Sequence, residues 1–163
     1  MGLHQTLNLL IKKRLILKSF ATSQTALVQM ELTRNHNLME NANGETILTT
    51  FLTYQNQYKI FHWQTRSYSQ HKSFGEIYES LTENIDEFME TFMGKYGRII
   101  SASTFDFSLD NYSEGFGEYN DEFISFLSDE LPGYLNEGDT DLLNIRDEIL
   151  GSVNQLKYLL TLV

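Results

Sequence analysis

The sequence predicts an all-α protein, built as a bundle of four helices with one long connection in the middle. Apolar side chains recur at steps of three and four residues, the spacing of one helix face, in four separate segments. Between the second and the third segment, residues 97–117 show no sustained period, and this stretch is too long for a hairpin loop between antiparallel helices. With 163 residues, 41% of them apolar, the chain is long enough for one well-buried core.

The first helix is expected at residues 45–65. Asn41 to Gly44 form a turn-forming cluster that can cap a helix. After this cluster, apolar residues follow at steps of four, three, four and three: Ile47, Phe51, Tyr54, Tyr58 and Phe61. Thr65 to Ser69 have no periodicity, so we expect a short connection there.

The second helix is expected soon after this connection. Ser73 and Glu76 have the spacing of a capping box, and Ser69 is an equally good N-cap if the helix begins one turn earlier. Gly94 and Gly97 are expected to end the helix. Its apolar stripe consists of Phe74, Ile77, Tyr78, Leu81, Ile85, Phe88 and Met89.

Two shorter helices are expected after the long connection. Pro132 and Gly133 end the third helix, because proline cannot continue a helix. Asp139 or Thr140 can cap the fourth. A short loop, a long crossover between helices 2 and 3 and another short loop are the wiring of a ferritin-like four-helix bundle. The apolar stripes are Tyr119, Phe123, Phe126, Leu127 and Leu131 in the third helix, and Leu142, Ile145, Ile149, Val153, Leu156 and Leu160 in the fourth.

Residues 1–42 differ from the rest and are expected to form a basic, flexible extension of a domain at residues 43–163. Residues 1–36 hold five Lys or Arg against one Glu, a net charge of +4, and the other residues hold seven against 21, a net charge of −14. The extension could instead be a removable transit-like segment, or sequence upstream of a later start such as Met39. Met1 to Thr6 also fit the short pattern for N-myristoylation.

Charge and composition restrict the possible functions. An acidic body repels phosphate backbones, so nucleic-acid binding is expected only if residues 1–36 provide it. Lys12, Lys13 and Arg14 interrupt the most apolar N-terminal stretch, so we expect a soluble, cytoplasmic protein with no membrane partner. The chain has no cysteine, and any metal must therefore be bound by histidine and carboxylate side chains.

Four residues form a candidate metal and catalytic site: His62, His71, Asp86 and Glu90. Imidazole and carboxylate together suit iron, manganese or zinc. Asp86 and Glu90 are four residues apart and share one helix face. His71 and Asp86 are 15 residues apart on the same predicted helix, a separation of about 22 Å, so they cannot bind one ion within one chain.

A second copy of the chain would bring these residues together. If the second helix packs antiparallel against its own copy, crossing near Glu79 or Ser80, the histidine end of each helix meets the carboxylate end of the other. Two identical sites result, each with two histidines from one chain and two carboxylates from its partner. We therefore expect a two-fold homodimer.

The end of the first predicted helix and the second predicted helix carry a specific pattern: Tyr58-Lys59-Ile60-Phe61-His62-Trp63, His71, Phe74, Tyr78, Ile85-Asp86-Glu87 and Glu90. This pattern resembles the Dps family of mini-ferritins. The resemblance implies a ferritin-like fold, an intersubunit site that binds and oxidises Fe(II), commonly with peroxide, and assembly into a higher homo-oligomer such as a dodecamer. In this family such a site sequesters iron and protects against oxidative damage.

The sequence also departs from the Dps pattern. Four residues after the second histidine the family usually has an Asp ligand, whereas this chain has Gly75 followed by Glu76. The loop between the histidines is about three residues shorter than usual. The alternative function is therefore a catalytically weakened ferritin-like structural or interaction protein. In simpler interpretations, each histidine is a satisfied polar group near a helix end, the two acids are a solvated face, and Trp63 packs in the core.

Overall fold

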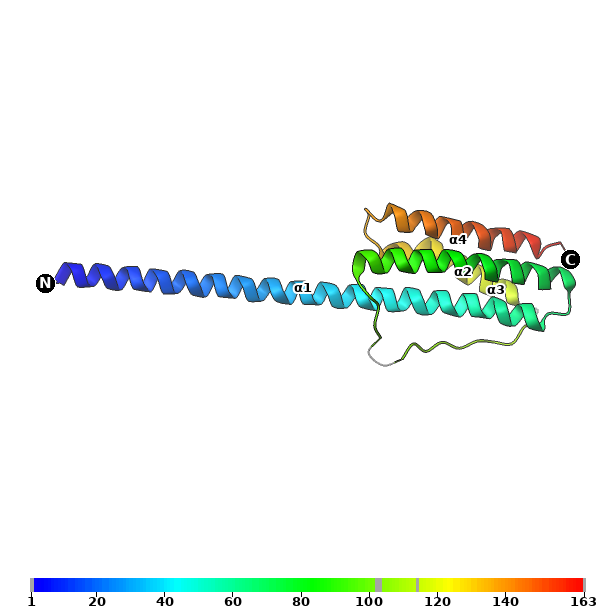
Figure 1. Ribbon diagram of the computed structural model, residues 1–163, viewed down its shortest axis with the longest axis horizontal. Coiled ribbons are helices and arrows are strands. Elements are labelled where there is room, and N and C mark those ends of the chain that lie inside the picture. The colour runs from blue at the N-terminus through cyan, green and yellow to red at the C-terminus, as the bar shows by residue number, and fades with distance from the viewer. Residues whose placement is uncertain (1, 102–103, 114, 163) are drawn as a thin grey trace. The chain divides into compact units, whose positions relative to one another are not determined.

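The computed structural model describes the backbone of residues 2–101, 104–113 and 115–162 (Figure 1). The side chains of residues 2–12, 15–17 and 19–21 are outside this description. The described residues are mostly helical and contain no strand, which confirms the all-α class and the four helices. The helices are α1 (Gly2–Gln64), α2 (Tyr68–Tyr96), α3 (Phe116–Ser125) and α4 (Thr140–Leu159).

The chain divides into two compact units, residues 1–39 and 40–163. In the first unit residues 2–39 are helical, and the described side chains from residue 22 to residue 39 are exposed. Met1, where the myristoylation pattern begins, lies outside the described residues, as do the side chains of residues 3–6. No helix in the described part of the chain has the length and apolar character needed to cross a membrane.

The predicted start of the first helix near residue 45 is wrong, because α1 is continuous through that position. Gly44 does not cap or break this helix. A Cβ atom at Gly44 would lie 2.7 Å from Ile99 Cγ1 and 2.9 Å from Phe92 Cε1. The glycine therefore allows the segment after α2 to approach α1 closely, a use of glycine that composition alone does not distinguish from a turn.

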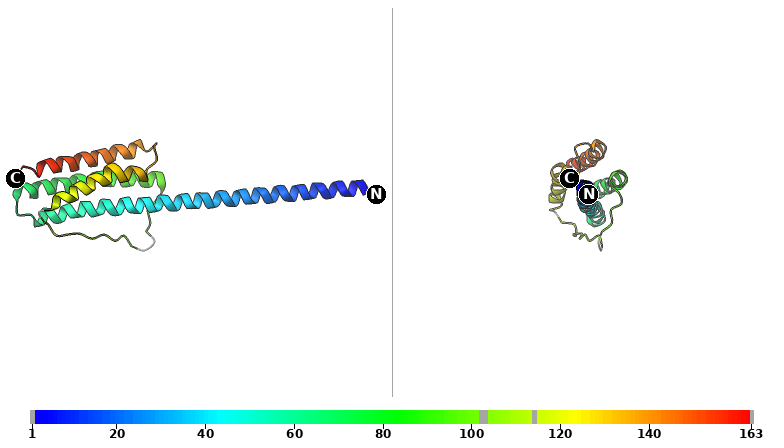
Figure 2. Two further views of the ribbon diagram at one scale, coloured as in Figure 1. Left: turned by 180° about the vertical axis from the view of Figure 1, so that it is seen from behind. Right: turned by 90° about the vertical axis from the view of Figure 1, so that its left-hand side faces the viewer.

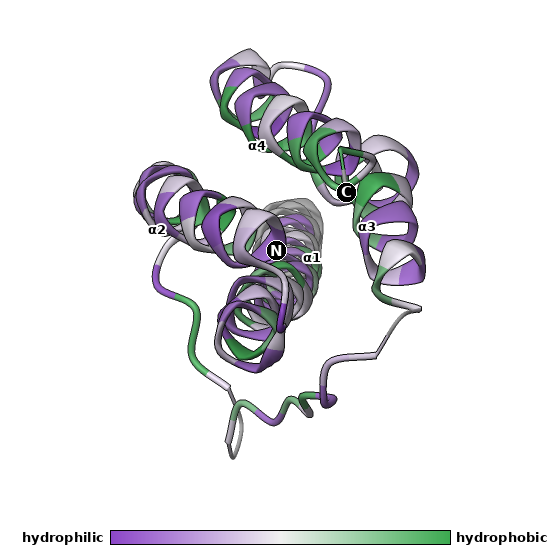
Figure 3. Ribbon diagram, turned by 90° about the vertical axis from the view of Figure 1, so that its right-hand side faces the viewer, coloured by the Kyte–Doolittle hydropathy of each residue, from purple (hydrophilic) through white to green (hydrophobic). Residues whose placement is uncertain are grey.

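The second unit is a four-helix bundle. The α1 residues from 40 onward and α4 run in one direction, and α2 and α3 run in the other (Figures 1 and 2). The crossover between α2 and α3 runs along the side of the bundle from one end to the other (Figure 1). The hydrophobic residues of the helices lie mainly on the helix faces that turn toward the interior of the bundle (Figure 3). The core includes Phe51, Phe61, Phe74, Leu81, Phe88, Phe92, Phe123, Leu127, Leu142, Ile149 and Val153, all at most 2% exposed.

The helix ends differ in detail from those expected. The N-cap of α2 is Ser67, whose side chain accepts a hydrogen bond from the backbone N–H of Gln70, rather than Ser69 or Ser73. Gly97 ends α2 with a φ of 90°, as expected of a glycine beyond a helix terminus. The third segment continues from α3 through a π-helical turn, η1 (Phe126–Glu130), and a 3₁₀ turn, η2 (Leu131–Tyr134).

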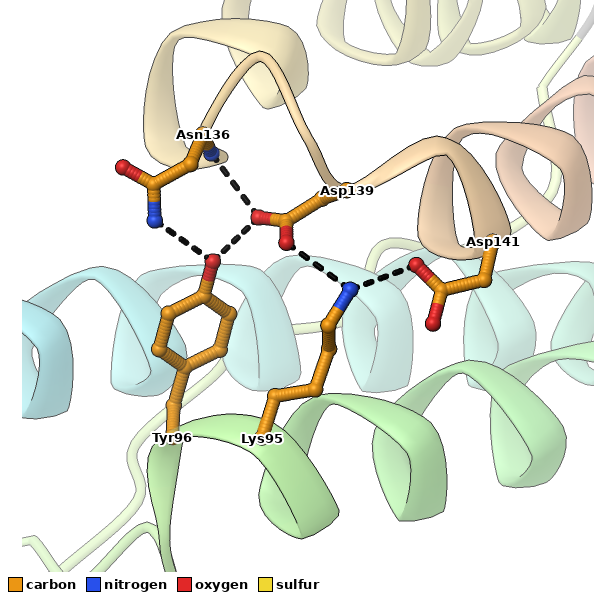
Figure 4. A network of polar contacts seen from close by, with 5 residues as sticks. All are labelled: Lys95, Tyr96, Asn136, Asp139 and Asp141. Atoms are coloured by element: carbon orange, nitrogen blue, oxygen red, sulfur yellow. Dashed lines mark hydrogen bonds and ion pairs between the residues drawn. The ribbon is translucent and has the colours of Figure 1, made fainter.

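A polar network joins the end of α2 to the start of α4 (Figure 4). The carboxylate of Asp139, which is 7% exposed, accepts hydrogen bonds from the Tyr96 hydroxyl and the backbone N–H of Asn136. Lys95 Nζ lies 2.9 Å from Asp139 and 2.6 Å from Asp141. Asp139 precedes α4, as expected for its N-cap, but its side chain makes no capping hydrogen bond, because the carboxylate is committed to this network.

Glutamine side chains of α1 hold the crossover. Gln57 is 1% exposed. Its amide donates to the carbonyl of Asp110 at 2.7 Å and accepts from the backbone N–H of Asp110 at 2.8 Å. Gln64 makes a similar pair, donating to Asn111 Oδ1 and accepting from the backbone N–H of Tyr112. The crossover is thus fixed along α1 although it has no regular secondary structure.

Candidate functional site

The structure brings two of the four predicted site residues together. His62 lies in the last turn of α1 and His71 in the first turns of α2, with the three-residue loop 65–67 between the helices. The two imidazole rings are stacked, with centroids 3.9 Å apart and planes inclined by 23°. Both side chains are partly buried.

Each histidine ring is bonded to the backbone of the other residue. His62 Nδ1 lies 2.7 Å from the carbonyl oxygen of His71, and His71 Nδ1 lies 2.9 Å from the carbonyl oxygen of His62. A carbonyl oxygen only accepts hydrogen bonds, so each Nδ1 must carry the proton and donate it. In the neutral form, each Nε2 then presents its lone pair.

The short loop between the helices sets this geometry. The backbone N–H of His71 donates to the carbonyl of Ser67, and the backbone N–H of Thr65 donates to the carbonyl of Phe61. The hydroxyl of Thr65 donates to Gln70 and accepts from the backbone N–H of Ser67. These bonds order both sides of the turn, so the two histidines are held by the backbone as well as by their rings.

Gly75 provides the space for the ring of His62. A Cβ atom at this position would lie 3.1 Å from both Cε1 and Nδ1 of His62. This distance is tighter than an ordinary van der Waals contact, so any side chain here would press on the ring. The position at which the Dps pattern has an acid is therefore next to the histidine pair, and the absence of a side chain there lets the ring lie against α2.

The two predicted acidic ligands lie elsewhere on the surface. Asp86 and Glu90 are exposed on α2, one turn apart. In the described part of the chain, neither forms an ion pair with a Lys or Arg, and no group of three or more His, Asp or Glu could hold a metal. Within one chain, His62 and His71 are thus in contact with each other, and Asp86 and Glu90 do not form a metal-binding group with them.

Trp63 is 66% exposed, so the prediction that it packs in the core is wrong. Its neighbour is Lys59, whose Nζ lies 5.6 Å from the Trp63 ring centroid and 4.2 Å from that of Tyr78. Both distances suit cation–π contacts. Lys59 is not among the predicted site residues, although the four-residue spacing from Lys59 to Trp63 on a helix is a signal for such a contact.

A polar groove of about 560 Å³ lies between α1, the crossover and α3. Burial and then the charge of Glu122 raise the pKa of Tyr54 to about 12. A hydrogen bond to Asp110, followed by burial, raises the pKa of Tyr119 to about 12. Both phenols therefore stay protonated at neutral pH and act as hydrogen-bond donors. The expected core pattern included these tyrosines but did not predict the groove.

A family model matches residues 62–160, which is more than half of the chain. The chain belongs to the family described as "Family of unknown function (DUF5856)". The matched region begins at His62 and includes all four candidate ligands. The chain is also similar to the "Uncharacterized 14.6 kDa protein in mobD-ri intergenic region" of Enterobacteria phage T4, with 26% identity over 121 residues, 74% of this chain and 90% of the relative. No solved structure matches the chain.

Proposed function

We propose that this protein binds iron at the interface between two copies of the chain. In this proposal the bundle is ferritin-like, and Fe(II) is the substrate. The ligands are His62 and His71 of one copy with Asp86 and Glu90 of the other. By the resemblance to Dps proteins, the bound Fe(II) is oxidised by peroxide or dioxygen and sequestered, which would protect the cell against oxidative damage.

The observation that carries the proposal is the reciprocal bonding of the two histidines. Metal-binding histidines usually donate their second ring N–H to a backbone carbonyl or a carboxylate, which fixes the ring and its tautomer. Here both rings donate Nδ1–H to a carbonyl. The two imidazoles thus have a fixed orientation and the tautomer that leaves Nε2 free to bind a metal. Two histidines that are neighbours on a surface by chance need neither property.

The carboxylates support the proposal by their exposure and charge. Asp86 and Glu90 are exposed on one helix face, so a second copy can reach them. The chain has a net charge of −10, and an acidic surface raises the local concentration of cations. Histidine and carboxylate donors together suit Fe(II).

The stacked rings must separate when they bind one ion. With metal–nitrogen bonds of about 2.1 Å, two imidazoles side by side on one ion hold their centroids roughly 4.5–5 Å apart. The centroids here are 3.9 Å apart. The donor set fits iron, and binding one ion requires a small opening of the pair.

Anaerobic titration with Fe(II), followed by addition of peroxide, tests the proposal. We expect saturable binding and an absorbance change on oxidation in the wild-type protein. The variant His71→Ala should lose both, and the matched control His36→Ala, at an exposed position of α1, should keep both. Absence of saturable binding in wild type, or unchanged binding in His71→Ala, would contradict the proposal.

A second candidate function is a structural one, in which the histidine pair only fastens α1 to α2. The closeness of the rings and the glycine at position 75 favour it. In that case His71→Ala would lower the melting temperature, and Fe(II) would not raise the melting temperature of the wild type. A rise in melting temperature with Fe(II) that is absent in His71→Ala would exclude this candidate.

A further inference from the structure

The exposed face of α2 has its charges separated along its length. The basic residues lie around its N-terminal end, where Arg66 and Lys72 are exposed and Lys59 is partly exposed. From Glu76 to Glu90 the charged residues of the helix are all acids, and all of them are exposed: Glu76, Glu79, Glu83, Asp86, Glu87 and Glu90. Lys95, in the last turn, is bound to Asp139 and Asp141. In the described part of the chain, none of these six acids has an ion-pair partner.

The charges lie on one continuous stripe. Lys72, Glu79 and Asp86 follow one another at steps of seven residues, which is two helical turns, and Glu90 follows four residues later. The buried residues of α2 lie on a different face of the helix. Tyr68, 78% exposed, begins the same stripe, and Trp63 is exposed at the nearby end of α1. Large exposed aromatic side chains of this kind are common anchors of protein interfaces.

We propose that this stripe is a self-recognition surface, on which a second copy of the chain docks antiparallel through opposite charges. A crossing between residues 79 and 80 places Lys72 of one copy between the levels of Glu83 and Glu90 of the other. The two-fold symmetry repeats the same contact at the other end. A basic partner would complement only the acidic half of the stripe and an acidic partner only the other half, whereas a second copy complements both.

This inference shares the antiparallel pairing with the proposed function but none of its metal chemistry. Its recognition chemistry is electrostatic, so assembly must respond to ionic strength and to charge reversal in the absence of any metal. The two proposals can therefore fail separately.

Sedimentation velocity in a chelator-containing, metal-free buffer measures the assembly. We expect the wild-type dissociation constant to rise by about tenfold or more between low and high salt. Lys72→Glu should weaken the dimer by about tenfold or more at low salt. The double variant Lys72→Glu/Glu83→Lys exchanges the charges of one pair and should restore most of the affinity, while all four proposed iron ligands stay intact. Glu148→Lys, at an exposed position of α4, is the matched control and should assemble as wild type.

Three results would overturn the inference: a wild-type protein that stays monomeric, a dimer unaffected by Lys72→Glu, or a double variant no better than the single one. If the charge exchange behaves as expected but wild type binds no Fe(II), only the proposed function fails. If wild type binds Fe(II) at the histidines but Lys72→Glu assembles normally, only this inference fails. Circular dichroism confirms that each variant is folded.

Discussion

Gly75 has two opposing effects on α2. A glycine inside a helix costs about 0.5–1 kcal/mol relative to alanine, because its backbone loses more conformational freedom on folding. At the same time, its missing side chain leaves room for the ring of His62. The glycine at position 75 therefore lowers the stability of α2 and allows the ring of His62 to lie against this helix.

The variant Gly75→Ala should move the ring of His62. We expect weaker Fe(II) binding than in wild type, with little net change in stability, because the gain in helix propensity is offset by the 3.1 Å contact. Gly94→Ala is the control, since a Cβ atom there meets nothing within 4 Å. It should raise stability by about 0.5–1 kcal/mol and leave Fe(II) binding unchanged. Thermal melting and Fe(II) titration check both variants, and equal iron binding in the two would contradict the role of Gly75.

The junction between α2 and α4 depends on one carboxylate. Burial alone would raise the pKa of Asp139, but hydrogen bonds from Lys95, Tyr96 and the backbone of Asn136 outweigh burial and hold this pKa below its usual value. The hydrogen bonds that Lys95 donates to Asp139 and Asp141 raise the pKa of Lys95. The network therefore favours the charged form of both partners and links two helices that are distant in sequence.

Asp139→Asn should destabilise the protein at neutral pH by about 1–3 kcal/mol, because it removes the charge from a buried hydrogen-bonded group. The folded-state pKa of Asp139 is lowered, so its contribution is fully present above the unfolded-state value of about 3.9 and is lost as pH falls through the folded-state value. The free energy of unfolding of the wild type should therefore approach that of Asp139→Asn as the pH falls into the acid range. Denaturant unfolding at several pH values measures this, with Glu148→Gln as the control. If the difference in the free energy of unfolding between wild type and Asp139→Asn stays constant with pH, the lowered pKa of Asp139 does not stabilise the fold.

At the level of elements, the sequence pattern predicted α2, α3 and α4 well, because each buries a stripe at helical spacing. It failed at the start of α1, where Gly44 serves close packing instead of a turn. The N-cap Ser67 was missed because serines at 69 and 73 have similar local patterns. The contact between the histidines could not be predicted, since it depends on the geometry of a three-residue loop. Whether Asp86 and Glu90 join them depends on a second chain.

At the scale of the whole molecule, the proposed dimer brings like charges together near its two-fold axis. Glu79 lies next to the expected two-fold axis, so the two copies of this residue would face each other, and like charges at such a distance repel. This repulsion is a direct consequence of a crossing near Glu79, and an antiparallel crossing elsewhere along α2 would not bring the two copies of Glu79 together.

Glu79→Gln should therefore strengthen the dimer several-fold at low salt, and the effect should disappear at high salt. Glu148→Gln, on α4, should have no effect. Sedimentation velocity at two ionic strengths checks this expectation. An unchanged or weaker dimer in Glu79→Gln would place the crossing elsewhere along α2.

The amide of Gln57 forms the same two hydrogen bonds with the backbone of Asp110 that a neighbouring strand would form. This single side chain thus acts as one rung of a β-ladder for a segment that has no strand beside it. As a consequence, the backbone N–H of Asp110 should exchange slowly with deuterium although it belongs to an irregular stretch. In the variant Gln57→Glu, the carboxylate cannot donate to the carbonyl of Asp110. We therefore expect the N–H of Asp110 to exchange faster and the crossover between α2 and α3 to be held less firmly.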